Sequence, residues 1–175
     1  MAYELVAERG LAGLSMRAVA RRVGATTGLV SHHFLDRAEL VSAALDHAAW
    51  VMQHRSIEAG GADAHPVELL VSVLPTDPAT VENWRFALSV RAAALSDDDY
   101  RRFDDAIAQH WAGFLPQRLG RFVTGDASAA ADHLVAVADG VALRAAVNPR
   151  AWPAERQRAH VQLAFDALTT QGAFP

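Results

Sequence analysis

Residues 14–30 decide the fold, and they read Leu-Ser-Met-Arg-Ala-Val-Ala-Arg-Arg-Val-Gly-Ala-Thr-Thr-Gly-Leu-Val. Ser15 is suited to cap a short helix over about residues 16–23, which would end at Gly24. Thr26 or Thr27 is suited to cap a second short helix that ends near His33. Two short helices joined by a tight turn that contains glycine are typical of a helix-turn-helix unit.

The side chains of the two helices divide into an inner and an outer set. We expect Val19, Val23 and Val30 to pack where the helices cross. The second helix would then present its polar side chains to solvent, as a helix that enters the major groove of DNA does. An ordinary helical hairpin has the same pattern, so the hairpin by itself is weak support for DNA binding.

The charge of the chain is unevenly distributed. The chain has 175 residues and a net charge of −4, the wrong sign for a nucleic-acid-binding protein taken as a whole. Residues 9–37, however, contain five Arg and a single acid, Asp36, which gives +4. The remaining residues contain 11 Arg and 19 acids, which gives −8. A basic segment on an acidic body favours a phosphate-binding surface, although a solvated helix face would have the same composition.

Several classes of protein are excluded or disfavoured. The absence of Cys excludes a disulfide scaffold, a Cys-based zinc finger and an iron–sulfur site. No signal peptide or membrane-length apolar run is found, so we expect a cytoplasmic protein that does not enter a membrane. The chain lacks a metal-binding His-Glu-x-x-His, a Gly-rich phosphate loop and a nucleophile elbow. We therefore predict no enzyme activity, catalytic residue, metal or cofactor, and interpret Asp104 and Asp105 as a solvated face.

The periodicity outside residues 14–30 is helical almost throughout, which predicts an all-α fold. A helix over residues 2–9 precedes the hairpin, and Asp36 and Glu39 have the spacing of a capping box at the start of a long helix over 37–58. Residues 59–66 are a predicted hinge. Further helices are predicted at 66–74, 77–95, from 97 with a kink or break at Pro116, 128–147 and 153–171. This makes about nine helices, divided into a DNA-binding domain at 1–45 and a helical effector-binding and dimerisation domain at 46–175.

Residues 5–45 resemble the DNA-binding domain of the TetR family of transcriptional regulators. The resemblance rests on Leu-Val-Ala-Glu-Arg-Gly at 5–10, on Leu-Ser-Met-Arg-Ala-Val-Ala at 14–20, and on Val-Gly-Ala-Thr-Thr-Gly-Leu-Val-Ser-His-His-Phe-Leu-Asp-Arg-Ala-Glu-Leu at 23–40. The stretch Asp-Gly-Val-Ala-Leu-Arg-Ala at 139–145 further resembles the C-terminal domain of the BetI-like subgroup. His32-His33-Phe34 after Ser31 favours the same subgroup.

The resemblance implies a set of DNA-binding residues at the positions that match the family motif. The implied residues are Ser15, Arg17, Thr26, Thr27, Gly28, Ser31, His32 and Arg37. Arg17 would reach a base edge, and His32 and Arg37 would contact phosphates, Arg37 in place of the usual Lys. Ser31 replaces the usual Tyr, Leu29 replaces a usual Thr, and the usual basic stretch before the first helix is missing. Each departure should weaken phosphate anchoring.

The resemblance also implies an effector pocket and a homodimer. The predicted pocket residues are Trp84, Leu88, Arg91, Phe103, His110, Trp111 and Phe114, although core packing explains many such aromatics equally well. A choline-type cation would suit an aromatic cage. The predicted dimer-interface residues are Leu134, Ala138, Val141, Ala145, Val161, Phe165 and Leu168, and packing within one chain is the alternative. Close approach of another helix would explain Gly140 in the middle of a helix.

These observations predict a TetR-like regulator, specifically a repressor that binds a palindromic operator as a homodimer. A small-molecule effector would favour a state whose recognition helices are wrongly spaced for two successive major grooves, so that DNA is released. The long helix over 37–58 would transmit the change. The alternative is an all-α protein that binds or sequesters a small molecule and has lost DNA binding.

Overall fold

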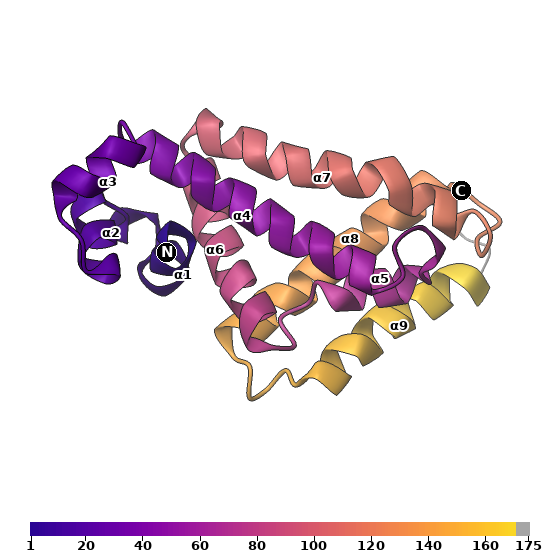
Figure 1. Ribbon diagram of the computed structural model, residues 1–175. Helices are drawn as coiled ribbons and strands as arrows, with labels where there is room; N and C mark the ends of the chain where they lie inside the picture. Colours follow the sequence, from indigo (N-terminus) through magenta and orange to yellow (C-terminus); the bar gives the residue numbers. More distant parts are fainter. Residues whose placement is uncertain (171–175) are drawn as a thin grey trace.

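The computed structural model describes residues 1–170, and this part of the chain contains nine α-helices and two short 3-10 helices (Figure 1). The predicted all-α fold is confirmed. The end of the last predicted helix at Gln171 and the tail of the predicted second domain, residues 171–175, lie outside the described residues. None of the described helices is long and apolar enough to span a membrane.

Three short helices form the headpiece at one end of the molecule, on the left of Figure 1. They are α1 (Ala2–Arg9), α2 (Met16–Val23) and α3 (Thr27–His33). The helix α4 (Arg37–Glu58) leaves the headpiece and runs along the larger domain (Figure 1). The larger domain contains α5 (Pro66–Ser72), α6 (Pro78–Ala94), α7 (Asp98–Leu119), α8 (Ala127–Val147) and α9 (Ala154–Thr170). The predicted boundary between residues 45 and 46 falls inside α4 and remains a prediction.

Helix caps fix the starts of α2, α3 and α4. The side-chain oxygens of Ser15, Thr26 and Asp36 each accept a hydrogen bond from the backbone N–H three residues later, at 3.1, 3.3 and 3.0 Å. These bonds satisfy donors that the first turn of a helix leaves without a partner. Glu39 accepts from the N–H of Leu35 at 2.7 Å rather than from Asp36, so only the first half of the predicted capping box forms.

The helix α7 passes through Pro116 and ends at Leu119, so the predicted break at this proline does not occur. Proline lacks an N–H, and its ring crowds the carbonyl four residues earlier. The residue lies in the last turn of α7, where the helix ends within one turn in any case. The backbone beyond it closes normally, because Gly120 N–H donates to the Pro116 carbonyl at 2.9 Å.

The buried apolar side chains form two cores, and α6 contributes to both. One core lies among α5–α9 and includes Trp84, Trp111 and Leu115. The other belongs to the headpiece and the first half of α4, and it includes Phe86 and Val90 from α6. Since Phe86 and Val90 are completely buried there, α6 is a structural part of the headpiece as well as of the larger domain.

Candidate nucleic-acid interface and ligand pocket

The turn between α2 and α3 has the geometry that the sequence predicts. Gly24 adopts φ 66° and ψ 26°, the left-handed conformation that ends a helix and that side chains with a Cβ resist. Its N–H donates to the carbonyl of Arg21, and the next N–H, from Ala25, donates to Ala20. The turn therefore directs the chain sharply from one helix into the next, as a helix-turn-helix unit requires.

Most of α3 faces solvent. Val30 is buried under the helix, whereas residues 26–29 and 31–33 are exposed. The exposed residues include the predicted contacts Thr27, Gly28, Ser31 and His32. Thr26 is exposed too, but its hydroxyl already caps the helix. The predicted recognition residues thus share one short exposed helix, and their contact with DNA stays a prediction.

Two further predicted contacts, Ser15 and Arg17, are exposed at the N-terminus of α2. The Ser15 side chain accepts from Ala18 N–H at 3.1 Å, so its oxygen holds the helix end. Val19 is buried between the helices as predicted, but the prediction for Val23 was wrong, because 45% of its surface is exposed. Val23 is the last residue of α2, and it lies beyond the part of α2 that its neighbours cover.

Arg37, predicted as a phosphate contact, is bound to the backbone of the headpiece. Its Nε donates to the carbonyl of Leu14 at 3.1 Å, and one terminal nitrogen donates to the carbonyl of Leu11 at 2.7 Å. The guanidinium therefore ties the start of α4 to the segment that precedes α2. Hydrogen bonds from a charged donor are among the stronger ones, so Arg37 has a structural role whether or not it also meets DNA.

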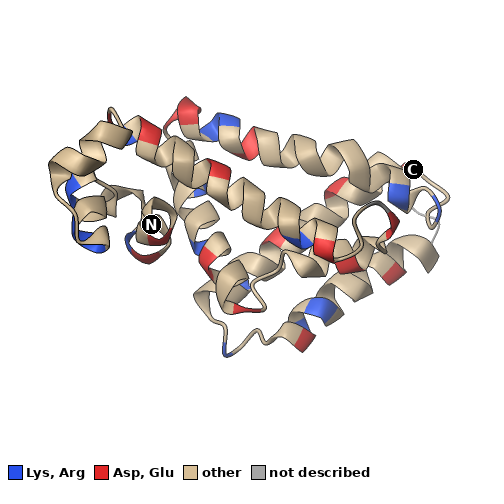
Figure 2. Cartoon of the chain, viewed as in Figure 1, with Lys and Arg blue, Asp and Glu red and all other residues tan. Residues whose placement is uncertain are grey.

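The folded headpiece is less basic than residues 9–37 suggest. Helix α1 adds Glu4 and Glu8, and Arg22 forms ion pairs with both of these carboxylates. The hydrogen bond from Arg22 lowers the pKa of Glu8. Over residues 1–37 there are five Arg and three acids, which gives +2. Basic and acidic residues accordingly both occur at this end of the molecule (Figure 2).

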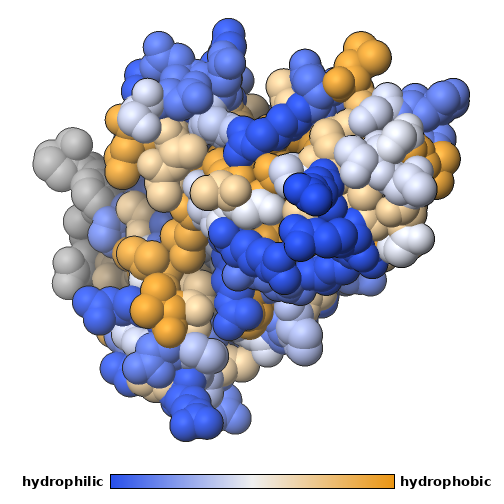
Figure 3. Space-filling view, turned by 90° about the vertical axis from the view of Figure 1, so that its left-hand side faces the viewer, coloured by the Kyte–Doolittle hydropathy of each residue, from blue (hydrophilic) through white to orange (hydrophobic). Residues whose placement is uncertain are grey.

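The face that carries the headpiece combines hydrophilic and apolar side chains (Figure 3). Two leucines are prominent among the exposed apolar residues of the headpiece, namely Leu29 on α3 and Leu35 in the loop before α4. Leu29 exposes 54% of its surface beside the predicted recognition residues. The predicted recognition helix thus carries an exposed apolar side chain next to Ser31.

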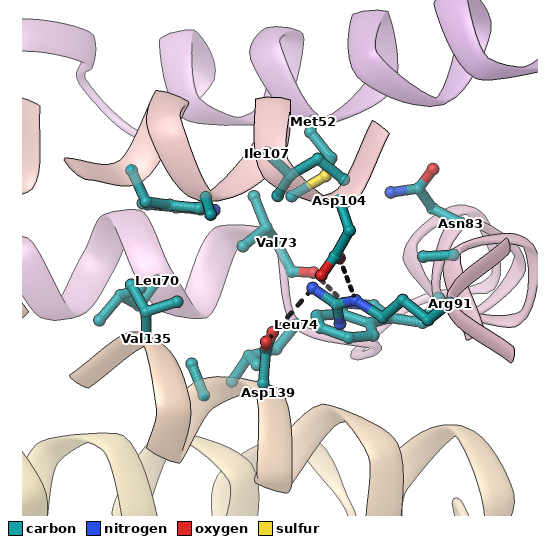
Figure 4. Close-up of a pocket in the computed structure, with 15 residues that line it drawn as sticks. Met52, Leu70, Val73, Leu74, Asn83, Arg91, Asp104, Ile107, Val135 and Asp139 are labelled. Atoms are coloured by element: carbon teal, nitrogen blue, oxygen red, sulfur yellow. Dashed lines mark hydrogen bonds and ion pairs between the residues drawn. The ribbon is translucent and has the colours of Figure 1, made fainter. Parts of the chain in front are cut away.

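The larger domain contains a cavity of about 90 Å³ between α4, α5, α6, α7 and α8 (Figure 4). Three predicted pocket residues, Trp84, Arg91 and Trp111, line it. The indole of Trp84 is fixed in place, because its Nε1–H donates to the carbonyl of Val73 at 2.6 Å. Most of the remaining wall is apolar, so the polar groups of this cavity are few and their positions matter.

Two other predicted pocket residues, Phe103 and His110, line a neighbouring groove between α4 and α7, of about 300 Å³. Met52, Ile107 and Trp111 line both the groove and the cavity.

The last two predicted pocket residues do not line either space. Leu88 is partly buried and packs against the core of the larger domain. Phe114 packs against the same core, and the guanidinium carbon of Arg118 lies 4.7 Å from the centre of its ring. The sequence could not separate these two from pocket residues, since core and pocket side chains have the same helical spacing.

Two carboxylates that the sequence interpretation did not assign to the pocket hold Arg91 from opposite sides (Figure 4). Its Nε lies 2.7 Å from Asp104 Oδ1, and a terminal nitrogen lies 3.2 Å from Asp139 Oδ2. Burial raises the pKa of Asp139, and Arg91 opposes that rise. Burial acts to lower the pKa of Arg91, but Asp139 and Asp104 outweigh it and raise the pKa. Of the pair interpreted as a solvated face, Asp105 is exposed, whereas Asp104 is partly buried and paired with Arg91.

One hint of these carboxylates was present in the sequence. Asp139 follows the buried Ala138 on the apolar side of α8, where an acid is unusual unless it is paired. Asp104 gave no such sign, because it stands in a strongly acidic stretch at the start of α7.

The structure corrects the predicted dimer interface. All seven predicted residues are buried within the protomer, at no more than 7% exposure: Leu134, Ala138, Val141, Ala145, Val161, Phe165 and Leu168. They pack α8 and α9 against each other and against the rest of their own domain, so they are not available to a partner. The opposite sides of the two helices carry exposed apolar residues, namely Leu143, Val147 and Leu163. Within residues 1–170, no atom would lie within 4 Å of a Cβ at Gly140, so no helix of this part of the chain explains the glycine.

Comparison with known proteins relates both parts of the chain to described families. A family model for bacterial regulatory proteins of the tetR family matches residues 1–44. A model for the C-terminal domain of BetI-type transcriptional repressors matches residues 67–170. Among curated relatives, the HTH-type transcriptional regulator BetI of Ectopseudomonas mendocina is 27% identical over 96% of this chain and 88% of its own length.

Solved structures show the same fold. A transcriptional regulator from Rhodococcus sp. Rha1 is similar with a TM-score of 0.85 and 26% identity, and the match covers 99% of this chain and 95% of that one. A transcriptional regulator from Saccharomonospora viridis, solved in complex with choline, has a TM-score of 0.77 at 20% identity, covering 92% of this chain and 89% of that one.

Proposed function

The chain belongs to the TetR family of transcriptional regulators, with a BetI-type C-terminal domain, and from this premise we propose that it is a ligand-responsive repressor. It is a helix-turn-helix regulator and not an enzyme. The proposal includes a homodimer in the cytoplasm that binds a palindromic operator and that a small-molecule effector releases from DNA. The observation that carries it is the exposed α3, set by Gly24 and two helix caps, on the same chain as a cavity of the larger domain.

For the DNA contacts we propose that α3 enters the major groove with Thr27 and Gly28 facing the bases. Arg17 is exposed at the start of α2, and in this proposal it reaches a base edge nearby. A bidentate Arg–guanine contact contributes roughly 1–3 kcal/mol of discrimination between bases. His32 and Ser31 supply the phosphate contacts in this proposal.

For the homodimer we propose an interface on the exposed sides of α8 and α9, in place of the buried residues. Leu143, Val147 and Leu163 lie on these sides, at 47%, 74% and 67% exposure. A two-fold axis through this surface would pair the same residues from both protomers. Gly140, which none of the described residues of its own chain crowds, would allow the partner helix to approach closely.

For the response to an effector we propose that α6 transmits the change to the headpiece, together with α4. Asn83 of α6 lines the cavity, and its Oδ1 accepts a hydrogen bond from the Tyr3 hydroxyl of α1 at 3.2 Å. Both residues are buried, and Phe86 of the same helix lies in the headpiece core. A ligand that binds better when α6 is displaced would shift the population toward a headpiece with altered spacing.

The proposed function is tested by fluorescence anisotropy with the DNA that precedes the gene, at about 0.1 M and about 0.2 M salt, because phosphate contacts make affinity strongly salt-dependent. Arg17→Ala should weaken specific binding about tenfold and relax the preference at one base pair. Arg150→Ala is the matched control, since it removes the same charge from an exposed position in the turn between α8 and α9. No specific binding at either salt concentration would instead support a protein that only binds or sequesters a small molecule.

A further inference from the structure

The guanidinium of Arg91 is held by contacts of the kind that a bound organic cation would make. Its Nε and a terminal nitrogen lie 2.7 and 3.2 Å from the carboxylate oxygens of Asp104 and Asp139. Its central carbon lies 5.4 Å from the centre of the Trp84 ring, within the range of a cation–π interaction. These three groups come from α7, α8 and α6, and they surround the guanidinium at the wall of the cavity (Figure 4).

The charges at this site do not balance. Two carboxylates face one guanidinium, and the other side chains that line the cavity are apolar or uncharged. An excess of negative charge in a partly buried place is unfavourable, and a second cation would relieve it. An anionic ligand would have to compete with both carboxylates for Arg91. The site therefore favours a cation.

The hydrogen-bonding chemistry narrows the class of cation. A carboxylate gains most from donors, and a planar fork of N–H groups matches it best. A quaternary ammonium has no N–H group, so it would leave the oxygens of Asp104 and Asp139 without donors. The same cavity is also lined by Leu74, Ile107 and Val135, which suit an apolar body.

We propose that the cavity binds a small cation with N–H donors on an apolar body, a guanidine, amidine or primary amine, which competes with Arg91 for Asp104 and Asp139. This inference rests on the proposed function only for its effect on DNA. When the ligand takes both carboxylates, Arg91 no longer ties α6 to α7 and α8. The same α6 holds Tyr3 through Asn83, so its release changes the support of the headpiece.

Calorimetric titration of the full chain tests the ligand class, with benzamidine, choline and benzoate as probes. We expect benzamidine to bind at least tenfold more tightly than choline, and benzoate not to bind. Asp139→Asn should weaken benzamidine binding tenfold or more, and Asp132→Asn, an exposed Asp on the same helix, should leave it unchanged. Choline binding as tightly as benzamidine, or benzamidine binding that is insensitive to Asp139→Asn, would overturn the proposal.

Arg91→Ala should change benzamidine affinity in the opposite direction to Asp139→Asn. A general loss of structure would weaken binding in both variants, so it cannot produce this result. Removal of the internal competitor should strengthen benzamidine binding about tenfold, whereas a ligand that pairs with Arg91 would bind more weakly. Arg85→Ala, at an exposed position on the same helix, is the control. Circular dichroism checks that all variants retain their helices, and weaker benzamidine binding to folded Arg91→Ala would also overturn the proposal.

The DNA measurement separates the two proposals. If the exchange mechanism holds, Arg91→Ala should lower operator affinity without any ligand, and benzamidine should lower it in the wild-type protein. A chain that binds benzamidine as expected but binds no operator would contradict the proposed function and support the pocket. An operator affinity that neither Arg91→Ala nor saturating benzamidine changes would contradict the exchange of Arg91 as the trigger.

Discussion

The exposed surface of the headpiece and the cavity of the larger domain are built in opposite ways. The predicted DNA-binding residues lie between positions 15 and 37, close together in the chain, and helix caps and one glycine place them. The cavity takes its residues from five helices and the turn after α5, between positions 52 and 139. A surface of the first kind can be located from local sequence, whereas a cavity of the second kind depends on how the helices pack. The two regions nevertheless share α6.

Removal of the Phe86 side chain should have the largest effect on stability. It also tests whether the headpiece can be separated from the larger domain. Phe86 belongs to α6, but it is completely buried in the headpiece core. Phe86→Ala should lower the free energy of unfolding by about 3–5 kcal/mol, as is typical of a large buried side chain. Urea unfolding followed by circular dichroism measures the change.

Phe122→Ala is the control for this experiment, because Phe122 is 40% exposed and belongs to the larger domain. Its effect should be clearly smaller. DNA affinity that survives Phe86→Ala without change would show that the headpiece does not need α6.

Substitution of Arg37 should separate a structural residue from a DNA contact within the headpiece. Its two hydrogen bonds to the carbonyls of Leu11 and Leu14 predict that Arg37→Ala lowers the free energy of unfolding by about 1–2 kcal/mol. Arg37→Lys should lower it almost as much, since an ammonium cannot reproduce the fork that meets both carbonyls. Thermal unfolding measures the structural role of Arg37, and the salt dependence of DNA binding measures its contact with a phosphate.

If Arg37 contacts a phosphate instead, stability should be nearly unchanged and Arg37→Ala should reduce the slope of log affinity against log salt by about 0.9. Arg37→Lys would then bind DNA almost like the wild type.

Local patterns predicted the headpiece better than the larger domain for physical reasons. A cap bonds to a backbone N–H three residues away. Residues within one turn of the helix start, namely Ser15, Thr26 and Asp36, therefore suffice to predict where each helix begins. Burial depends on distant neighbours, which is why Val23 at the end of α2 was predicted wrongly. The partners Asp104 and Asp139 lie on different helices from Arg91, and helical periodicity contains no information on that pairing.

The burial of the predicted dimer-interface residues within the protomer was missed for a related reason. An apolar stripe on a helix indicates that the helix packs against something, but not whether the partner is its own domain or a second copy. Leu134 and Val161 lie on the stripes of α8 and α9, and both stripes turned out to face the protomer's own core. Leu143 and Leu163 stand outside these stripes and are exposed, which helical periodicity alone did not single out.

Restoring a family-typical side chain on α3 should have a moderate effect on DNA affinity. Ser31 is exposed, so Ser31→Tyr should not disturb the core. The longer side chain should reach a phosphate and raise DNA affinity severalfold, about 1 kcal/mol for a hydrogen bond. Ser31→Phe, which adds the ring without the hydroxyl, is the control in the same anisotropy measurement. Equal gains for both variants would assign the effect to apolar contact.

The smallest expected effect is on the pH dependence of stability. It concerns His110, which lines the groove beside the cavity. Burial lowers the pKa of His110, whose ring lies 4.9 Å from that of Phe114. The unfolded chain therefore takes up a proton more readily, and stability should fall as the pH drops below the ordinary value of about 6.5. His110→Gln should reduce this loss by a few tenths of a kcal/mol, because the site is partly exposed. Urea unfolding at pH values on both sides of about 6.5 tests it, with His160→Gln as an exposed control.

The burial of Phe86 and Val90 under α1 and α4 has a consequence for protein engineering. A headpiece cut after residue 45 is not a self-contained cassette, because two of its core side chains would stay behind on α6. A chimera that grafts this headpiece onto another sensor domain would need matching side chains on the new α6, or must carry α6 with it. The unit of exchange in this molecule is a set of packed surfaces, and it is not a continuous segment of chain.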